Sequence, residues 1–397
     1  MEHIKKYVLF YAKIRIGETM KDIMKKLDKT LFILTIIFSI FGLIMIFSSS
    51  SISAVLQYKS TEYHFFYKQA LFLIVGFALS FIIYFVPIDW YKKTSILGIG
   101  AIIFILIGLK TYGHVTNSAR SWFKILDFSV QPSEFAKTLI IIYLACWYGN
   151  KKKFATIYDT FIPLIPCIII FFLVASEPDL GTASIIASIC MFIFFTLPFK
   201  RNLVMMLLKV GTISAIIFAL VFLNGNSNLL TSTQASRFNF KNPCSRYLEE
   251  TGYQVCNGYI PINNGGLFGV GLGKSTQKYL YLPESHTDII FPIIIEELGL
   301  ISGAIIMILY MVILFRILVI ARNAKKLSGS IIAFGTFSYI LTHIIINLGG
   351  LLALIPLTGV PLPFLSYGGS FILNLLILIA LTQRVAIENK KSVRRNA

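Results

Sequence analysis

Long apolar runs recur along this chain. Several of them approach or exceed the length of a membrane-spanning helix. A transmembrane helix needs about 20 mostly apolar residues, and only 14% of the 397 residues are charged, against roughly 25% in soluble domains. The sequence therefore predicts an all-α polytopic membrane protein with about ten transmembrane helices. The expected spans lie near residues 30–50, 69–88, 94–110, 132–149, 160–176, 182–198, 204–223, 289–321, 330–352 and 370–384.

Basic residues are concentrated in alternate segments between these runs. The chain has 36 Lys and Arg residues against 18 Asp and Glu residues, and such an excess in alternate loops follows the positive-inside rule. The pattern predicts that both termini are cytoplasmic. Basic patches interleaved with aromatic residues, which nucleic-acid binding would use, are absent, so no nucleic-acid partner is expected. The basic clusters lie at residues 5–29, 92–93, 151–153, 200–201, 322–326 and 390–395.

The same pattern predicts one integral membrane domain and no separate soluble domain. A basic cytoplasmic N-terminal tail covers residues 1–29, the membrane domain covers residues 30–384, and a second basic cytoplasmic tail covers residues 385–397. One large extracytoplasmic loop, residues 224–288, lies between spans seven and eight. Structureless loops of such length are uncommon unless they are functional, so this loop is expected to carry part of a site.

Two cysteines lie in this large outer loop. Cys244 and Cys256 would face an oxidising compartment, where two thiols can form a disulfide. Two free and separated thiols are the alternative, because spacing alone does not decide the pairing.

Ionisable residues gather where the large loop meets span eight. Glu284, His286 and Asp288 lie within five residues, directly before the apolar run. A carboxylate at such a boundary is costly to desolvate, which indicates a function for Asp288. A helix N-cap is the structural alternative. One His with two carboxylates and no HExxH spacing is a weak metal signal, so the identity of any metal stays open.

Two further pairs of charged residues lie at the outer ends of predicted spans. Glu134 and Lys137 share one helical face at i,i+3 spacing. They form either a structural ion pair or the floor of a polar cavity in which Lys137 attracts an anionic headgroup. Glu177 and Asp179 lie in the link between spans five and six. They belong either to a plain turn or to an outer cavity that binds a divalent cation or a sugar hydroxyl.

Loops on the predicted outer side supply the remaining candidates. Arg120 suits phosphate binding, whereas Trp122, two residues later, suits the membrane interface. Prolines and glycines in residues 356–370 resist regular helix and are compatible with a re-entrant segment that is shielded from lipid. Ser366 in this segment, and Lys274 at the end of a glycine-dense run, are candidate substrate contacts. The sequence lacks Walker, Rossmann and GxSxG motifs, so no nucleotide or redox cofactor is expected.

At these motifs the chain resembles the SEDS family (shape, elongation, division and sporulation), which comprises the FtsW, RodA and SpoVE proteins. The resemblance covers residues 32–384, and its wording favours the FtsW/SpoVE branch over RodA. The matching motifs occur in order as ARSWF, QPSEFAK, EPDLGTA, GYQ, NGGLFGVGLG, YLPESHTD, EELG and PLPFLSYGGS.

The resemblance implies a peptidoglycan glycosyltransferase, a hexosyltransferase that polymerises lipid II at the outer face of the bacterial cytoplasmic membrane for division, elongation or sporulation. Lipid II is an undecaprenyl-pyrophosphate-linked disaccharide-peptide. In the family the aspartate of the HTD motif is essential, and it corresponds to Asp288, the expected general base. The expected substrate-binding residues are Arg120, Trp122, Glu134, Lys137, Glu177, Asp179, Lys274, Glu284, His286 and Ser366.

The resemblance also implies partners and leaves two alternatives open. Expected partners are a class B penicillin-binding protein, which is a transpeptidase, and other divisome or elongasome membrane proteins, while a divalent cation such as Mg²⁺ or Mn²⁺ is compatible with the reaction. Ile289 and Pro292 stand where the family commonly has Phe and often Ala. A lipid II flippase or a non-catalytic divisome scaffold remains the alternative function.

Overall fold

The computed structural model describes residues 20–116, 119–125, 128–149, 157–177, 179–197, 241–279, 282 and 285–393. Within them, seven helical segments are long and apolar enough to cross a membrane, which confirms the helical membrane class. Nine of the predicted spans coincide with described helices, and the seventh, residues 204–223, lies outside the described residues. The nine correspond to α3 (Lys29–Leu56), α4 (His64–Phe85), α5 (Tyr91–Tyr112), α6 (Pro132–Gly149), α7 with α8 (Ile157–Phe161, Leu164–Ala175), α9 (Leu180–Thr196), α13 (Ile290–Arg322), α14 (Leu327–Leu351) and α15 (Gly369–Val393).

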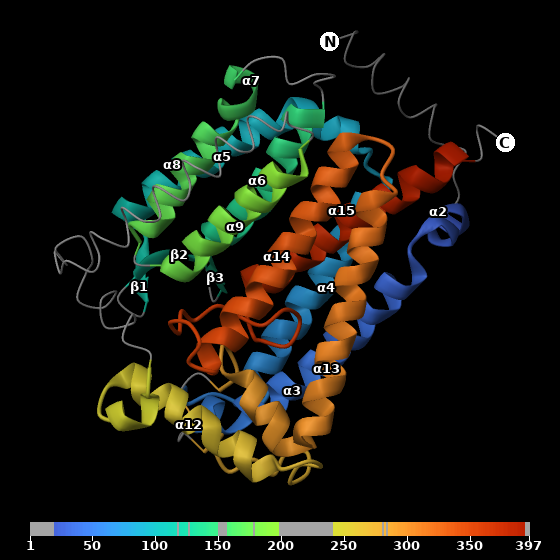
Figure 1. Ribbon diagram of the computed structural model, residues 1–397. Helices are drawn as coiled ribbons and strands as arrows, with labels where there is room; N and C mark the ends of the chain where they lie inside the picture. Colours follow the sequence, from blue (N-terminus) through green and yellow to red (C-terminus); the bar gives the residue numbers. More distant parts are fainter. Residues whose placement is uncertain are drawn as a thin grey trace.

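Helix α15 forms the centre of the bundle. In the most apolar stretch of α15, 89% of the residues are buried, whereas in that of α4 only 22% are. Helix α15 packs against α4, α6, α13 and α14 (Figure 1). Isoleucine, leucine and phenylalanine side chains cover the outer faces of α3, α4, α5, α8 and α13. Such helices, apolar on every side, suit a bundle surrounded by lipid.

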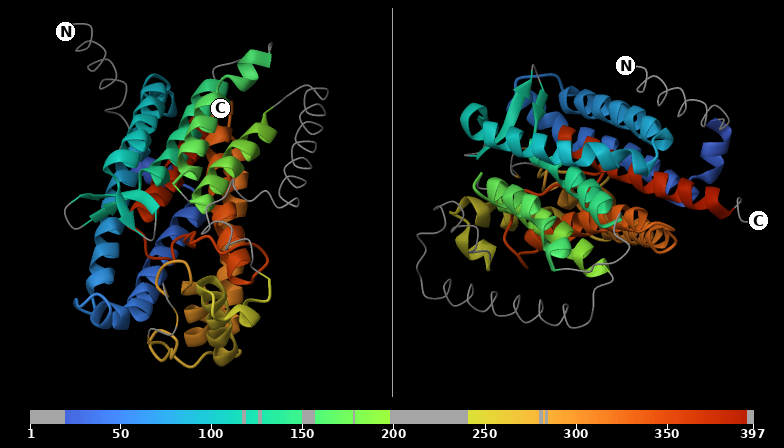
Figure 2. Two further views of the ribbon diagram at one scale, coloured as in Figure 1. Left: turned by 90° about the vertical axis from the view of Figure 1, so that its left-hand side faces the viewer. Right: turned by 90° about the horizontal axis from the view of Figure 1, so that it is seen from above.

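One end of the bundle, here termed the α12 end, carries the irregular parts of the chain. The helix α12 (Glu250–Gly265) lies across this end, close to the start of α13 (Figures 1 and 2). Residues 352–368, between α14 and α15, form no regular helix, as their prolines and glycines predict. Lys274, Asp288 and both cysteines of the large loop also belong to this end.

A small antiparallel sheet lies at the same end, where the sequence predicted only a loop. It consists of β1 (His114–Thr116), β2 (Ala119–Ile125) and β3 (Phe128–Val130) in the order β1-β2-β3. Trp122 is the register partner of His114. Strands this short give a weak alternation signal, which explains why the sequence did not reveal them.

Helix α13 is two helices joined at a break. Gly299 has a φ of +83° and is not helical. A Cβ atom at Gly299 would lie 2.2 Å from the backbone oxygen of Leu267, so only glycine permits this approach. The N–H groups of Leu300 and Ile301 donate to the oxygens of Gly266 and Leu267. The glycine-dense run therefore packs its backbone into the break of α13.

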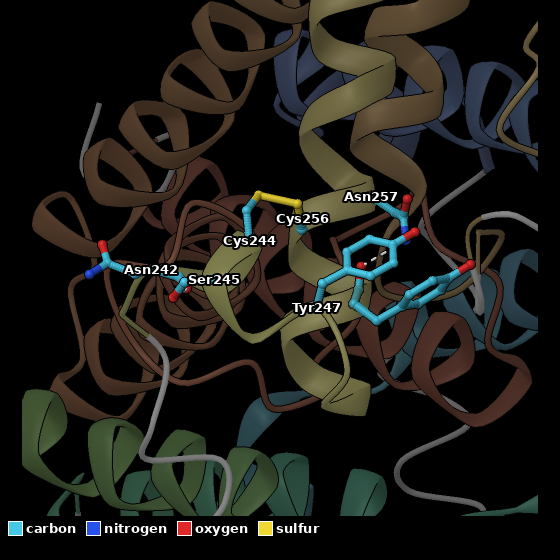
Figure 3. The surroundings of a disulfide bond; sticks show 7 residues. Asn242, Cys244, Ser245, Tyr247, Cys256 and Asn257 are labelled. Carbon is cyan, nitrogen blue, oxygen red and sulfur yellow. Dashed lines mark hydrogen bonds between the residues drawn. A yellow bond between two sulfur atoms is a disulfide. The ribbon is translucent and has the colours of Figure 1, made fainter.

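The large outer loop contains ordered structure at its end. A 3-10 helix, η3 (Pro243–Arg246), precedes α12, and a disulfide joins Cys244 to Cys256 (Figure 3). Beside it, Asn257 Nδ2 donates to the Tyr247 hydroxyl at 3.4 Å. The structure thus contains the disulfide that the sequence left open, and it ties η3 to α12.

The opposite end of the bundle is held by ion pairs and side chain to backbone hydrogen bonds. A short helix, α2 (Met20–Lys26), lies beside the last turns of α15 (Figure 1). Asp28, which follows α2, forms an ion pair with Arg316 of α13, and Arg384 of α15 donates to the Tyr84 oxygen at 2.7 Å. A 3-10 helix, η1 (Ile88–Trp90), connects α4 to α5.

Candidate active site

Asp288 lies at the α12 end, in the loop that leads into α13. Its side chain is half-buried, and its Oδ1 atom accepts a hydrogen bond from Thr287 Oγ1 at 3.2 Å. The N-cap position of α13 is Ile289, which makes no side-chain capping bond. The alternative that Asp288 serves as the N-cap of span eight is therefore not what the structure shows.

Residues 352–368 lie against Asp288. A Cβ atom on Gly359, which has a φ of +72°, would lie 3.7 Å from Asp288 Oδ2. Asn347 of α14 donates from Nδ2 to the backbone oxygens of Asp288, at 2.7 Å, and Val360, at 2.8 Å. The Asn347 amide thus links the Asp288 loop to residues 352–368.

Other side chains hold the same irregular segment from several helices. His343 Nδ1 lies 3.1 Å from the Pro361 oxygen, and the Tyr310 hydroxyl donates to the Pro363 oxygen. The N–H of Tyr367 donates to the His286 oxygen at 2.9 Å. Irregular backbone at membrane depth needs such partners because lipid offers none.

Glu134 and Lys137 form a buried ion pair behind this segment. Lys137 is fully buried, and its Nζ lies 2.7 Å from Glu134 Oε1. The same Nζ lies 3.5 Å from His343 Nε2 and 5.5 Å from the ring centroid of Tyr339. Tyr339 donates to Glu134 Oε2 at 3.3 Å. The pair lies within α6, and its contacts with Tyr339 and His343 connect α6 to α14.

Glu177 is a buried carboxyl group in the turn between α8 and α9. Both carboxyl oxygens are buried, and no described group meets the full geometry of a hydrogen bond to them. Burial raises the pKa of Glu177 to about 8 and the charge of Asp179 adds to this rise, while the nearby Ser121 hydroxyl and the charge of Lys110 oppose it. Glu177 is therefore mostly protonated at neutral pH, and it can donate a hydrogen bond to a polar ligand.

Asp179 is the N-cap of α9. Its Oδ1 accepts from the Thr182 N–H at 2.9 Å, and its Oδ2 accepts from Gln131 Nε2 at 3.0 Å. A Cβ atom on Gly181 would lie 2.7 Å from Val360. Because Val360 shares Asn347 with Asp288, the start of α9 belongs to the same group of contacts as Asp288.

Other candidates lie on the sheet and the loop before α13. Trp122 is half-buried in β2, while Arg120 lies in β2 with its side chain outside the described residues. His286 is buried, with its ring centroid 4.4 Å from that of Phe65. Burial lowers the pKa of His286 to about 4, so the imidazole is neutral at neutral pH. Glu284 lies outside the described residues.

Lys274 and Ser366 differ in their surroundings. The Lys274 side chain is exposed at the α12 end. Ser366 is fully buried, and its hydroxyl accepts a hydrogen bond from the Leu362 N–H at 2.8 Å. Ser366 therefore braces a turn of residues 352–368, whereas Lys274 is open to a ligand.

Sequence reasoning missed two buried carboxylates in the EELG motif. Lys278 Nζ lies 3.1 Å from Glu297 Oε1, and Ser48 of α3 donates to Glu297 at 2.7 Å. Glu296 accepts hydrogen bonds from the hydroxyls of Ser275 and Thr276. Two adjacent acids inside an apolar run are the signal that could have identified them, because intramembrane charges need partners.

In the described part of the chain, no group of three or more His, Cys, Asp or Glu side chains is arranged to hold a metal ion. Mg²⁺ often binds through one or two carboxylates together with substrate phosphates. The carboxylates at the α12 end fit only this mode, in which the substrate supplies some of the ligands.

Comparison with known proteins gives a consistent result. The family described as "Cell cycle protein", FTSW_RODA_SPOVE, matches residues 28–391. The chain is 37% identical, over 94% of each chain, to the probable peptidoglycan glycosyltransferase FtsW of Bacillus subtilis strain 168. It is 35% identical to stage V sporulation protein E of the same bacterium, over 90% of this chain and 96% of that protein.

Solved structures share the fold. One is a chain of a complex described as "Structural coordination of polymerization and crosslinking by a peptidoglycan synthase complex", with a TM-score of 0.71 and 21% identity, over 91% of this chain and 98% of that one. Another is the rod shape determining protein RodA of Thermus thermophilus, with a TM-score of 0.65 and 23% identity, over 91% and 96% of the two chains. This multi-pass membrane protein therefore belongs to the SEDS family, in its FtsW/SpoVE branch.

Proposed function

We propose that this chain polymerises lipid II into glycan strands at the outer face of the bacterial cytoplasmic membrane, with Asp288 as the general base. Relatives named peptidoglycan glycosyltransferase are 31–37% identical over most of the chain, and they support this activity. The observation that carries the assignment of Asp288 is its position, half-buried opposite Gly359 and held by Asn347. Because Gly359 has no side chain, it adds no bulk on this side of Asp288 Oδ2, where we place the acceptor hydroxyl.

In the proposed reaction, the Asp288 carboxylate accepts the proton of the C4 hydroxyl of the acceptor glycan. The hydroxyl oxygen then attacks the anomeric carbon of the donor, and a new glycosidic C–O bond forms. The bond from that carbon to the pyrophosphate oxygen breaks, and undecaprenyl pyrophosphate leaves with the electron pair. Direct displacement inverts the anomeric carbon and requires no covalent intermediate.

The leaving diphosphate needs positive charge nearby. Arg120 on β2 and the exposed Lys274 are the groups that we assign to it. Lys137 is fully buried against Glu134, so we assign it a positioning role, through His343 and Pro361. Glu177, protonated at neutral pH, is assigned to a sugar hydroxyl.

A divalent cation fits this site through the substrate. Asp179 is already bonded to Gln131 and Thr182, and the pKa of Glu177, about 8, leaves little negative charge there. Mg²⁺ or Mn²⁺ would therefore be held mainly by the diphosphate oxygens, because Asp288 serves the acceptor hydroxyl on the opposite face of the anomeric carbon. When bound, the ion would neutralise the developing charge of the leaving group.

The proposed function requires a partner for crosslinking and a defined orientation. A class B penicillin-binding protein would supply the peptide crosslinks, because the chain has no penicillin-binding motif of its own. We place the α12 end outside and both termini in the cytoplasm. The disulfide at this end supports that placement, since disulfides persist in oxidising compartments.

The test is glycan polymerisation from purified lipid II by the purified protein, alone and with its transpeptidase. Asp288→Asn is expected to lose activity by about 10²–10⁴-fold, the usual contribution of a general base, while it keeps the wild-type unfolding temperature. The exposed carboxylate Glu249, also at the α12 end, gives the control variant Glu249→Gln, which should polymerise normally.

Two results would contradict the proposal at different levels. A folded Asp288→Asn protein with full activity would remove the base assignment and leave the enzyme class intact. Absence of polymer from the wild type with every divalent ion and partner would favour the flippase or scaffold, and a lipid translocation assay in vesicles would then separate these two.

A further inference from the structure

The segment Gly266 to Tyr279, here termed the glycine loop, has inverted polarity. Its polar side chains Ser275 and Lys278 are buried, 1% and 4% exposed, against the carboxylates of Glu296 and Glu297. Its apolar side chains point outward, with Phe268 80%, Leu267 58% and Leu272 54% exposed. A loop that faces water would place these groups the other way round.

The depth of the glycine loop follows from its bonds to α13. Gly266 and Leu267 accept hydrogen bonds from the N–H groups of Leu300 and Ile301, which begin the long part of α13. From Leu300 to Arg322 this part is about 33 Å long at about 1.5 Å per residue, close to the hydrocarbon thickness of about 30 Å. Measured instead to Arg316, which pairs with Asp28, it is about 24 Å. By either measure, the loop meets α13 at the hydrocarbon boundary or inside it.

The outward side chains of the loop continue the lipid-facing surface of α13. Leu300, Ile301, Ile305 and Ile308 are each between 44% and 62% exposed on a helix that spans the membrane. The backbone bonds to Gly266 and Leu267 bring the loop to the end of this stripe. The apolar surface therefore runs from the helix onto the loop.

We propose that the glycine loop is a membrane anchor, with Leu267, Phe268, Val270 and Leu272 inserted into the hydrocarbon of the leaflet at the α12 end. Between Gly266 and Gln277 the only charged residue is Lys274, whose side chain is exposed. A lysine stem can lie along the apolar boundary while its ammonium stays at the phosphate level of the leaflet, which is also the level of a lipid-linked diphosphate. The binding partner is thus the bilayer itself, contacted by apolar side chains with one cation at the headgroup level.

Anchoring has a consequence for the site. The loop forms a hydrogen bond to Glu296 and an ion pair with Glu297. Both residues lie on the short part of α13 that directly follows Asp288. On the proposed function, the anchor fixes Asp288 at the level where a lipid-linked substrate presents its headgroup. The insertion itself does not depend on that function, and its test uses no activity measurement.

The test measures how close the loop lies to acyl chains. Phe268→Trp and, separately, Leu272→Trp are reconstituted into nanodiscs made with phospholipids brominated in the acyl chains, or with the unbrominated lipid. The fluorescence of wild type, which has three Trp residues, is subtracted. Ile308→Trp, on the exposed face of α13, is the control for lipid contact. Tyr58→Trp, in the polar connection between α3 and α4, is the control for water exposure.

We expect bromine to remove most of the added emission of the Phe268→Trp and Leu272→Trp proteins, as it does for Ile308→Trp, and to leave that of Tyr58→Trp nearly unchanged. Quenching of both loop variants no stronger than that of Tyr58→Trp would overturn the anchor. Quenching that disappears when the transpeptidase is reconstituted with the chain would also overturn it, in favour of a protein contact. The substitutions at Phe268, Leu272 and Ile308 each replace one exposed apolar side chain by another, so the fold should tolerate them.

Discussion

At the residue scale, the buried pair of Glu134 and Lys137 separates a structural role from a substrate-binding one. Removing one partner of a buried ion pair leaves an uncompensated charge, which typically costs about 3–5 kcal/mol. Lys137→Met is therefore expected to lower the stability of the protein by this amount. Thermal unfolding in nanodiscs measures it, and a wild-type unfolding temperature for Lys137→Met would show that the pair does not hold α6 to α14.

The double variant Glu134→Gln with Lys137→Met is the matched control, because it removes both charges together. We expect it to be more stable than Lys137→Met alone. If it is stable and still polymerises lipid II, Lys137 acts only through position. A stable double variant without activity would instead assign Lys137 to the substrate.

Glu177 gives a prediction with a defined pH window. Its pKa rises from 4.5 to about 8 on folding because the carboxyl is buried. Between these values the unfolded chain loses the proton and the folded chain keeps it, so stability falls as pH rises through the window and levels off above it. Glu177→Gln should remove this fall. The measurement compares the unfolding temperatures of wild type and Glu177→Gln at about pH 5 and about pH 8.5. An equal change of unfolding temperature in the two proteins would contradict the prediction.

The sequence located the charged residues of the site better than it located their partners. The pair of Glu134 and Lys137 was predictable because i,i+3 spacing is local. The partners of Glu296 and Glu297 lie in the glycine loop, some twenty residues earlier, and in α3, where Ser48 donates to Glu297, and no period in the sequence connects them. Lys278 was missed for this reason, and so was the depth at which Ser366 is buried.

At the element scale, apolar runs predicted the described membrane helices, but not α2, α12 or the break in α13. The break depends on a backbone contact from Leu267, which is remote in sequence, and the residue that permits it is one of two glycines in the helix. The sheet β1-β2-β3 was missed because its strands are short. Helix existence is thus decided locally by hydropathy, whereas kinks and small sheets depend on tertiary contacts.

The break makes Gly299 a sensitive position. Gly299→Ala places a Cβ atom 2.2 Å from the Leu267 oxygen, on a residue with a φ of +83°, and such strain typically costs about 1–3 kcal/mol. We expect a lower unfolding temperature and weaker polymerisation, because the part of α13 after Asp288 must shift.

Gly108→Ala is the control for this change, because a Cβ atom at Gly108 meets nothing within 4 Å. It lies inside α5, where alanine is favoured over glycine by roughly 0.5–1 kcal/mol. Gly108→Ala should therefore match or exceed the stability of wild type. Equal stability for the two variants would show that the contact with Leu267 is not rigid.

At the scale of the whole molecule, the disulfide reports orientation. With the α12 end outside, Cys244 and Cys256 are bonded in cells, while Cys146, Cys167 and Cys190 are free thiols in helices. In intact cells, we expect a membrane-impermeant maleimide to label this protein only after its disulfide is reduced. The double variant Cys244→Ser with Cys256→Ser should abolish that labelling. Labelling that requires lysis of the cells would place the α12 end in the cytoplasm.

The central position of α15 has a consequence for biosynthesis. The ribosome makes α15 after every other described helix, yet α15 supplies Asn374, which bonds to Thr138 of α6, and Gln383, which bonds to Asp28. Until it emerges, Thr138 and Asp28 lack these partners, and α4, α6, α13 and α14 lack the helix against which they pack. Completion of the bundle is therefore a late event in biosynthesis, because the most deeply buried of the described membrane helices is made last.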